Sequence, residues 1–167
     1  MTGFDCTTCG QYHSELPMCL GAPAPALWYS IPDAEKANRT ELSSDQCIID
    51  DHFFVLGRIM LPVIDGDGPF VWLAWVSLSE KNFLRSQELW NTEGRETEPA
   101  YFGWLQSDLP YGSSTLGLKA SVQTMPAGER PVITLEDSDH PLAIELNKGI
   151  SMQRVQKIVE AAVHSHL

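Results

Sequence analysis

The sequence predicts an α+β protein in which a mainly antiparallel sheet packs against helices. Two β-rich runs, residues 53–63 and 70–78, flank a turn rich in glycine and aspartate. Residues 115–124 alternate between apolar and polar side chains, which is typical of a half-exposed strand. From Ser151 onward, apolar side chains recur three and four residues apart, as in an amphipathic C-terminal helix. Because strands and helices do not alternate strictly, a parallel βαβ sheet is not expected.

The 167 residues fit a single domain. We divide it into a leading segment, residues 1–45, and a body of sheet and helices, residues 46–167. Prolines 17, 23, 25 and 32 prevent any long helix in the leading segment. We expect short helical pieces at residues 26–31 and 33–38, within an otherwise irregular segment that a metal ion holds in place.

The central hairpin is the clearest structural prediction. Residues 65–69 have the sequence DGDGP, which favours a tight turn between the two β-rich runs. In the second run both the odd and the even positions are apolar, from Phe70 to Val76. We therefore expect this strand to lie in the middle of the sheet with both faces covered.

The elements after the hairpin have weaker signals. Ser77 and Glu80 have the spacing of a capping box, which predicts a helix from there to about Trp90. The aromatic run at residues 101–105 is interpreted as a core segment, and the alternative is an anchor for a partner protein. A short strand at residues 132–136 continues the sheet.

Two helices complete the predicted fold. Asp139 is expected to cap a helix that begins near Pro141 and ends at Gly149. The last helix, from Ser151, is expected to bury one apolar stripe against the sheet.

Charge restricts the class of partner. The chain has 22 acidic and 11 basic side chains, which gives a net charge of −11. Phosphate backbones would be repelled, and no run of Lys or Arg offsets the repulsion, so we expect no nucleic-acid ligand. An acidic surface favours solubility and also speeds the encounter with a basic protein.

The sequence also predicts a location. Residues 1–5 have neither the basic start nor the apolar continuation of a secretory signal, and the longest apolar run, residues 70–76, is too short to cross a bilayer. We therefore expect a cytoplasmic protein without membrane association. In that reducing compartment, metal binding or burial explains the four cysteines better than disulfide formation does.

The N-terminal loop contains the strongest chemical motif. Cys6 and Cys9 form a Cys-x-x-Cys turn, followed by Gly10 and then by His13. Two thiolates at this spacing with an imidazole nearby are typical of a tetrahedral zinc site, and a glycine allows the chain to turn away. A redox dithiol normally starts a helix in a βαβ unit, a pattern that this loop lacks. The motif thus predicts a zinc-knuckle-like loop with structural zinc.

The fourth ligand has three candidates, Cys19, Cys47 and His52. Cys19 would complete a local knuckle of the kind that binds single-stranded nucleic acid, a ligand that the net charge disfavours. Cys47 begins an apolar run, so zinc would tie the loop to the sheet. His52 would face the other side of the strand unless residues 50–51 turn. The favoured set is Cys6, Cys9, His13 and Cys47, and Cys19 is kept as the reserve ligand.

Several motifs also carry a family resemblance, among them CTTCGQYHSELP from Cys6, SDQCIID from Ser44, WLAWVSLS from Trp72 and YFGWL from Tyr101. Over nearly the full length they resemble the bacterial family known as domain of unknown function 2199. The resemblance implies a single-domain prokaryotic protein and no known activity. Leu56 and Leu73 stand where the family pattern has arginine and glycine. The polar positions that match the pattern are Cys6, Cys9, His13 and Cys47, without Cys19.

Evidence for catalysis is weak in the sequence. Three sulfur ligands and one nitrogen ligand make a closed sphere, whereas a catalytic zinc keeps a position open for water. Asp139 and His140 are adjacent, and the side chains of adjacent residues rarely point at one another. On a single strand, the side chains of Cys47 and His52 would face opposite sides. The sequence therefore favours a protein without enzymatic activity.

The resulting hypothesis is a cytosolic, zinc-stabilised module that binds another protein, with a regulatory or immunity-like role by analogy with small acidic immunity proteins. The alternative is a small metal-dependent hydrolase or small-molecule sensor. It would need an open pocket near His52 or His140, or an incomplete zinc sphere. The sequence identifies neither the partner nor the oligomeric state.

Overall fold

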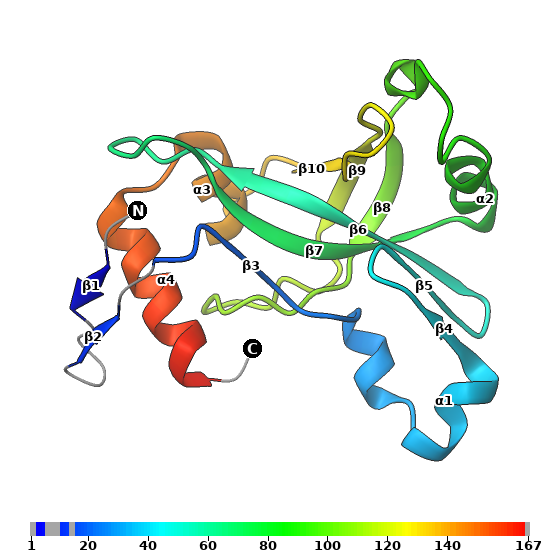
Figure 1. Cartoon of the computed structure of the whole chain (residues 1–167), viewed down its shortest axis with the longest axis horizontal. Helices are drawn as coiled ribbons and strands as arrows, with labels where there is room; N and C mark the ends of the chain where they lie inside the picture. Colours follow the sequence, from blue (N-terminus) through cyan, green and yellow to red (C-terminus); the bar gives the residue numbers. More distant parts are fainter. Residues whose placement is uncertain (1–2, 6–10, 14–15, 166–167) are drawn as a thin grey trace.

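The computed structural model describes residues 3–5, 11–13 and 16–165. In this part of the chain, four α-helices and an eight-stranded sheet form a mixed α+β fold (Figure 1). The strands follow the order β3-β7-β8-β9-β10-β6-β5-β4, and β6 also pairs with β7. This extra pairing closes β6, β7, β8, β9 and β10 into a five-stranded barrel. The α+β class is therefore confirmed.

The predicted central hairpin is present. Strands β6 (His52–Leu61) and β7 (Phe70–Leu78) pair antiparallel from Phe53 opposite Leu78 to Leu61 opposite Phe70. Both faces of β7 are covered, although unequally: the face of Trp72 is buried throughout, whereas on the other face Trp75 is buried and Val71 and Leu73 are half-buried. Trp72 and Val76 belong to the main core, whereas Trp75 belongs to a second apolar cluster on the other face.

Three short strands complete the barrel: β8 (Tyr101–Leu105), β9 (Lys119–Gln123) and β10 (Val132–Leu135). They follow β7 as antiparallel neighbours, and β10 then returns parallel to β6, with Val132 opposite Arg58. Gly57 permits this return, because a Cβ there would lie 2.7 Å from the Ile133 side chain. The sheet is mainly antiparallel, and its parallel pairs are β10 with β6 and β3 with β7.

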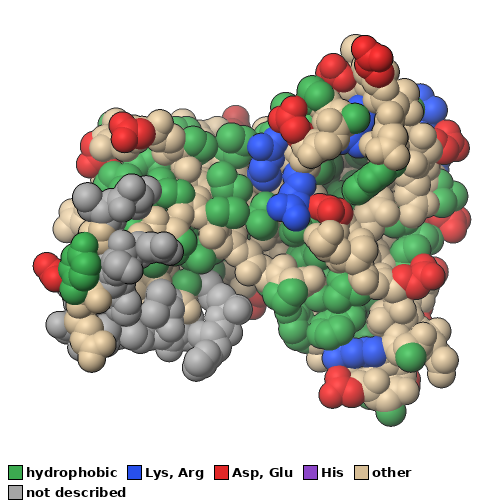
Figure 2. All heavy atoms as spheres, in the orientation of Figure 1, with side chains coloured by type: hydrophobic (Ala, Val, Ile, Leu, Met, Phe, Trp, Pro, Cys, Tyr) green, Lys and Arg blue, Asp and Glu red, His purple; other side chains and the backbone are tan. Residues whose placement is uncertain are grey.

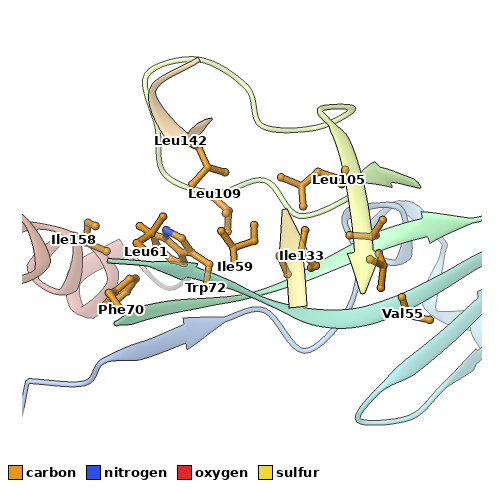
Figure 3. Close-up of a cluster of buried hydrophobic side chains, with 14 of the residues drawn as sticks. Val55, Ile59, Leu61, Phe70, Trp72, Leu105, Leu109, Ile133, Leu142 and Ile158 are labelled. Carbon is orange, nitrogen blue, oxygen red and sulfur yellow. The ribbon is translucent and has the colours of Figure 1, made fainter. Parts of the chain in front are cut away.

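The main core fills the barrel and extends beneath α3 (Pro141–Lys148) and α4 (Met152–Ser165). Figure 3 shows Ile59, Ile133 and Leu105 meeting from three different strands, with Leu142 and Ile158 coming from the two helices. The apolar stripe of the C-terminal helix is buried as predicted at Val155, Ile158 and Val159.

The leading segment is more regular than expected. It contains β3 (Cys19–Gly21), the 3-10 helix η1 (Ala26–Ser30), α1 (Asp33–Arg39) and β4 (Thr40–Leu42). The two helical pieces confirm the sequence prediction. Strand β3 extends the sheet beside β7, and Ile31 packs in the second apolar cluster. Hydrogen bonding and apolar packing thus order residues 16–45.

The hairpin of β5 (Gln46–Ile49) with β6 turns at Asp50 and Asp51, and Asp50 has a φ of 51°. This is the turn that the sequence left open. It places Ile49 opposite His52.

Two predicted helix caps are displaced. The cap of α2 (Glu80–Glu88) is Ser79, whose hydroxyl accepts from the Asn82 N–H, because Ser77 still belongs to β7. The cap of α3 is His140 and not Asp139. Its Nδ1 accepts from the Leu142 N–H, while its Nε2 lies 3.1 Å from the Ser114 carbonyl oxygen.

Strand β9 is shorter than predicted, because residues 115–118 form a turn before it. Thr115 is buried and its hydroxyl donates to the Ser107 carbonyl at 2.7 Å, while Gly117 has a φ of 80°. Leu116 is consequently exposed, whereas Ala120 and Val122 point into the core as expected.

None of the helices in the described ranges has the length and apolar character that a membrane crossing requires.

The close packing of β8 on β7 generates a test of the barrel. A Cβ at Gly103 would collide with the Ser77 carbonyl and the Val76 side chain. We expect Gly103→Ala to lower the free energy of unfolding by about 1–3 kcal/mol in urea titrations. Gly112→Ala is the matched control, because a Cβ there meets no atom within 4 Å and its stability should be unchanged. Equal stability of the two variants would contradict the strand packing.

Candidate functional site

One candidate site lies where β6 changes its neighbour. At the start of β6 the neighbour is β5, and Leu56 N–H donates to the carbonyl of Asp45, just before β5, at 2.9 Å. Two residues on, Arg58 N–H donates at 2.9 Å to Pro131, just before β10. The two neighbouring strands separate at this point, and a cavity of about 150 Å³ lies beside the gap. We call it the junction cavity.

The walls of the junction cavity are mostly apolar. They come from β6, β7, β8 and β9, from α2 and the chain after it, from Asp45 just before β5, and from the loop between β9 and β10. The apolar lining consists of Val55, Leu56, Leu78, Trp90, Tyr101, Val122, Met125 and Pro131. Burial raises the pKa of Tyr101 to about 12, so its hydroxyl stays protonated and donates to Glu98 at 3.0 Å.

Arg95 is the unusual residue of this cavity. It lies in the 3-10 helix η2 (Arg95–Thr97), and only 9% of it is exposed. Its guanidinium donates to four backbone carbonyls, those of Trp90, Met125, Pro126 and Glu129, at 2.7–3.1 Å. In the described part of the chain it has no carboxylate partner.

Two more arginines lie near the junction cavity. Arg130 pairs with Asp45 at 2.7 Å, and Arg58 donates to the Arg130 carbonyl at 2.9 Å. The Arg58 guanidinium is also 4.0 Å from the Glu129 carboxylate. Figure 2 shows basic side chains gathered over the part of the sheet where Figure 1 places β6 and β10, although the protein as a whole is acidic.

A second candidate site is a broad open groove of about 610 Å³ between β8 and the start of α2. Strand β8 alternates strictly, so Tyr101 and Leu105 point into the core while Phe102 and Trp104 point outward. Phe102 is 51% exposed and Trp104 is 43% exposed, and their rings meet edge to face at 5.0 Å. The core interpretation of this segment therefore holds for Tyr101 and Leu105 but not for Phe102 and Trp104. We call this site the aromatic groove.

The charged side chains that line the aromatic groove are acidic. Asp51 and Glu80 contribute carboxylates, and His52 lies 3.6 Å from Asp51. Among the described residues that line it, none is a Lys or an Arg. Lys119 is opposite Trp104 in β9, and its ammonium group lies 3.9 Å from the carboxylate of Glu136.

The predicted zinc ligands are distributed as follows. Cys6 and Cys9 lie outside the described residues. His13 is in β2 (Tyr12–His13), which pairs with β1 (Phe4–Asp5), and the Asp5 carbonyl accepts from Gln156 in α4. Cys47 is in β5. In Figure 1, β2 and β5 lie at opposite ends of the molecule.

Strand geometry accounts for this separation. Cys47 pairs with Phe54 near the start of β6, whereas α4 begins beside Asp65, beyond the end of that strand. At about 3.3 Å per residue, the eight residues from Phe54 to Leu61 alone span more than ~20 Å. The described structure therefore does not bring His13 and Cys47 together.

Cys47 has an apolar environment. It is 1% exposed and packs with Ile31, Ile49, Phe54 and Trp75. Burial raises the pKa of its thiol to about 11, so without a bound metal ion the thiol is protonated at neutral pH. Cys19 is exposed on β3.

No catalytic arrangement forms from the other residues that the sequence singled out. Cys47 is opposite Phe54, and His52 is exposed beside Asp51. His140 serves as the cap of α3. In the described ranges, no group of three or more His, Cys, Asp or Glu side chains could hold a metal ion.

Comparison with known families agrees with the motifs. The family described as an uncharacterized protein conserved in bacteria, DUF2199, matches residues 5–150. The chain belongs to this family. No curated protein and no solved structure matches this DUF2199 protein. The family supplies no activity, so function must be argued from the two candidate sites.

Sequence reasoning missed the junction cavity of this DUF2199 protein. Arg95 is surrounded by polar residues in the sequence, and three of its four carbonyl partners are about thirty residues away. One signal was usable: Pro126 and Pro131 lie in the 124–131 loop and lack the backbone N–H that could bond to its carbonyls.

The environment of Cys47 predicts its reactivity. With iodoacetamide at pH 8, we expect Cys47 to remain unmodified until urea unfolds the protein, because burial protects the thiol, whereas the exposed Cys19 should be alkylated once a strong chelator has removed any metal. Peptide mass spectrometry measures both sites. Protection of Cys47 should persist in a strong chelator. Labelling of Cys47 as soon as metal is removed would instead identify it as a zinc ligand.

Proposed function

We propose that this DUF2199 protein is a cytoplasmic protein-binding module that captures a basic segment of a partner in the aromatic groove. The observation that carries the proposal is the pair Phe102 and Trp104, exposed on a rigid strand beside the carboxylates of Asp51 and Glu80. Neither Phe102 nor Trp104 belongs to the two apolar core clusters, and Trp is among the residue types most enriched in interface hot spots.

The chemistry of the groove favours an arginine- or lysine-containing segment. A cation placed over the face of Trp104 or Phe102 is attracted by the ring and can also pair with Asp51 or Glu80. Glu80 additionally lies in the first turn of α2, where its charge offsets the partial positive charge of the helix terminus.

The net charge of −11 adds long-range attraction to these local contacts. A basic toxin, enzyme or regulator is the class of partner that this surface suits. The role would then be regulatory or immunity-like.

Structural zinc in the N-terminal loop is part of the same proposal. The motif of Cys6, Cys9 and His13 supports it, and the position of Cys47 makes Cys19 the stronger candidate for the fourth ligand. Zinc here would order the chain that precedes β3, while the groove itself is built from other elements.

The groove can be tested with a labelled arginine- and glycine-containing peptide, with binding measured by fluorescence polarisation. We expect Trp104→Ala to weaken binding about 10- to 30-fold, which corresponds to a hot spot of roughly 1.5–2 kcal/mol. Tyr29→Ala, at an aromatic residue 54% exposed elsewhere, should leave affinity unchanged. An equal loss in both variants would contradict the groove.

The acidic contribution needs its own comparison, because any basic peptide is attracted to an acidic protein. The double variant Asp51→Asn, Glu80→Gln should weaken binding by tenfold or more and flatten its salt dependence. The matched double variant Asp67→Asn, Asp108→Asn removes the same charge from exposed sites outside the groove. If the two double variants behave alike, attraction is non-specific and the proposal is wrong.

Zinc is tested by elemental analysis of protein purified without added metal. We expect close to one zinc ion per chain, lost in Cys9→Ser. Comparison of Cys19→Ser with Cys47→Ser identifies the fourth ligand, since only removal of a true ligand lowers the zinc content. Two results together would contradict a metal site: wild-type protein that contains no zinc, and a rate of proteolysis before Pro32 that chelators do not change.

A further inference from the structure

The junction cavity has the features of a ligand site that is independent of the aromatic groove. Its volume of about 150 Å³ matches that of an engineered apolar cavity that holds benzene, roughly 150 Å³. The apolar walls would therefore accept one ring or one short branched chain. The ion pair of Arg130 and Asp45, which is partly exposed to solvent, also lines the cavity.

Arg95 supplies a positive charge inside this cavity. An arginine has five N–H donors, and the four hydrogen bonds of Arg95 leave one Nη1 hydrogen without an acceptor in the part of the chain that the structure describes. The carbonyls satisfy most of its donors but carry no net charge. A buried guanidinium without a counter-ion is unfavourable, so an anion at this position would be stabilised.

The charged side chains that line the cavity are those of Arg95, Arg130, Asp45 and Glu129. Asp45 is paired with Arg130, and the Glu129 carboxylate is 4.0 Å from Arg58, which lies outside the lining. Among the described lining residues, Arg95 is therefore the cation without a carboxylate partner, although its guanidinium also lies 5.9 Å from the centre of the Trp90 ring.

We propose that the junction cavity binds a small monocarboxylate with a single aromatic ring or branched chain. The apolar group fills the space between Val122, Leu56 and Trp90, and the carboxylate accepts hydrogen bonds from Arg95. A phosphate ester is less suitable, because its second charge would face the carboxylates of Asp45 and Glu129.

Arg95 also has a structural effect, since its bonds to Met125, Pro126 and Glu129 hold the 124–131 loop against η2. This role alone predicts a stable protein with no ligand. The proposal predicts saturable binding in addition, so the two can be separated by experiment.

The experiment is a titration of ¹⁵N-labelled full-length protein with benzoate, 3-methylbutanoate and benzyl alcohol at millimolar concentrations. We expect saturable shifts from at least one carboxylate, confined to amides of residues 90–97 and 122–131. We expect benzyl alcohol to bind at least about tenfold more weakly than the carboxylates, because it lacks the charge that Arg95 recognises. Absence of saturable shifts with both carboxylates, or equal affinity for the alcohol, would overturn the proposal.

Variants locate the site without disturbing Arg95. Ser86 lines the cavity from α2, so Ser86→Phe should fill the space and abolish carboxylate binding. Leu84→Phe is the control, at an exposed position of the same helix outside the cavity. Urea unfolding verifies that both variants fold. Carboxylate binding that survives Ser86→Phe would place the ligand elsewhere and refute the junction cavity.

Arg95 itself is tested by Arg95→Lys and Arg95→Met. If the charge recognises the carboxylate, the lysine variant retains part of the affinity, while the methionine variant loses the preference for benzoate over benzyl alcohol. An unchanged preference in folded Arg95→Met protein would exclude Arg95 as the carboxylate-binding residue.

Discussion

The pairing of β6 with β7, buried on both faces, is the constraint from which both candidate sites follow. Trp72 and Trp75 point to opposite faces of β7, so the hairpin needs a cover on each side. The barrel supplies one cover, and η1, Ile31 and β5 supply the other. Because β6 is longer than β5, its edge is free to accept β10, and the change of neighbour leaves the junction cavity. Because β8 continues the barrel from β7, its alternation directs Phe102 and Trp104 to solvent.

The parts of the fold that could be predicted are those with local signals. A DGDGP turn between two apolar runs identifies the hairpin, and apolar spacing identifies α4. Other features depend on distant partners. Strand β3 is recognisable only through its pairing with Val71 to Leu73, and β10 closes the barrel through Gly57. The cap of α2 is Ser79 and not the predicted Ser77, because Ser77 pairs with Phe54 of β6 and so belongs to β7.

The candidate sites were less accessible to prediction for a related reason. In β8 every position is apolar or glycine, so periodicity does not reveal that Phe102 and Trp104 are exposed while Tyr101 is buried. The partners of Arg95 are backbone carbonyls, which leave no side-chain pattern. For the metal motif, the spacing of Cys6 and Cys9 is a local signal, whereas the apolar cluster that surrounds Cys47 is formed by residues distant in the sequence.

This acidic DUF2199 protein thus has two candidate sites, an exposed aromatic groove that we propose binds a basic segment and a mostly apolar cavity that we propose binds a small carboxylate. The central claim is that the groove is the partner-binding surface in the host cell. Site-specific photo-crosslinking tests it directly, with the photoreactive residue placed at position 104 and, as a control, at position 29. The account predicts a discrete adduct from position 104 alone, whose crosslinked peptide is rich in Lys or Arg. Adducts of equal yield from both positions, or a crosslinked peptide without basic residues, would contradict it.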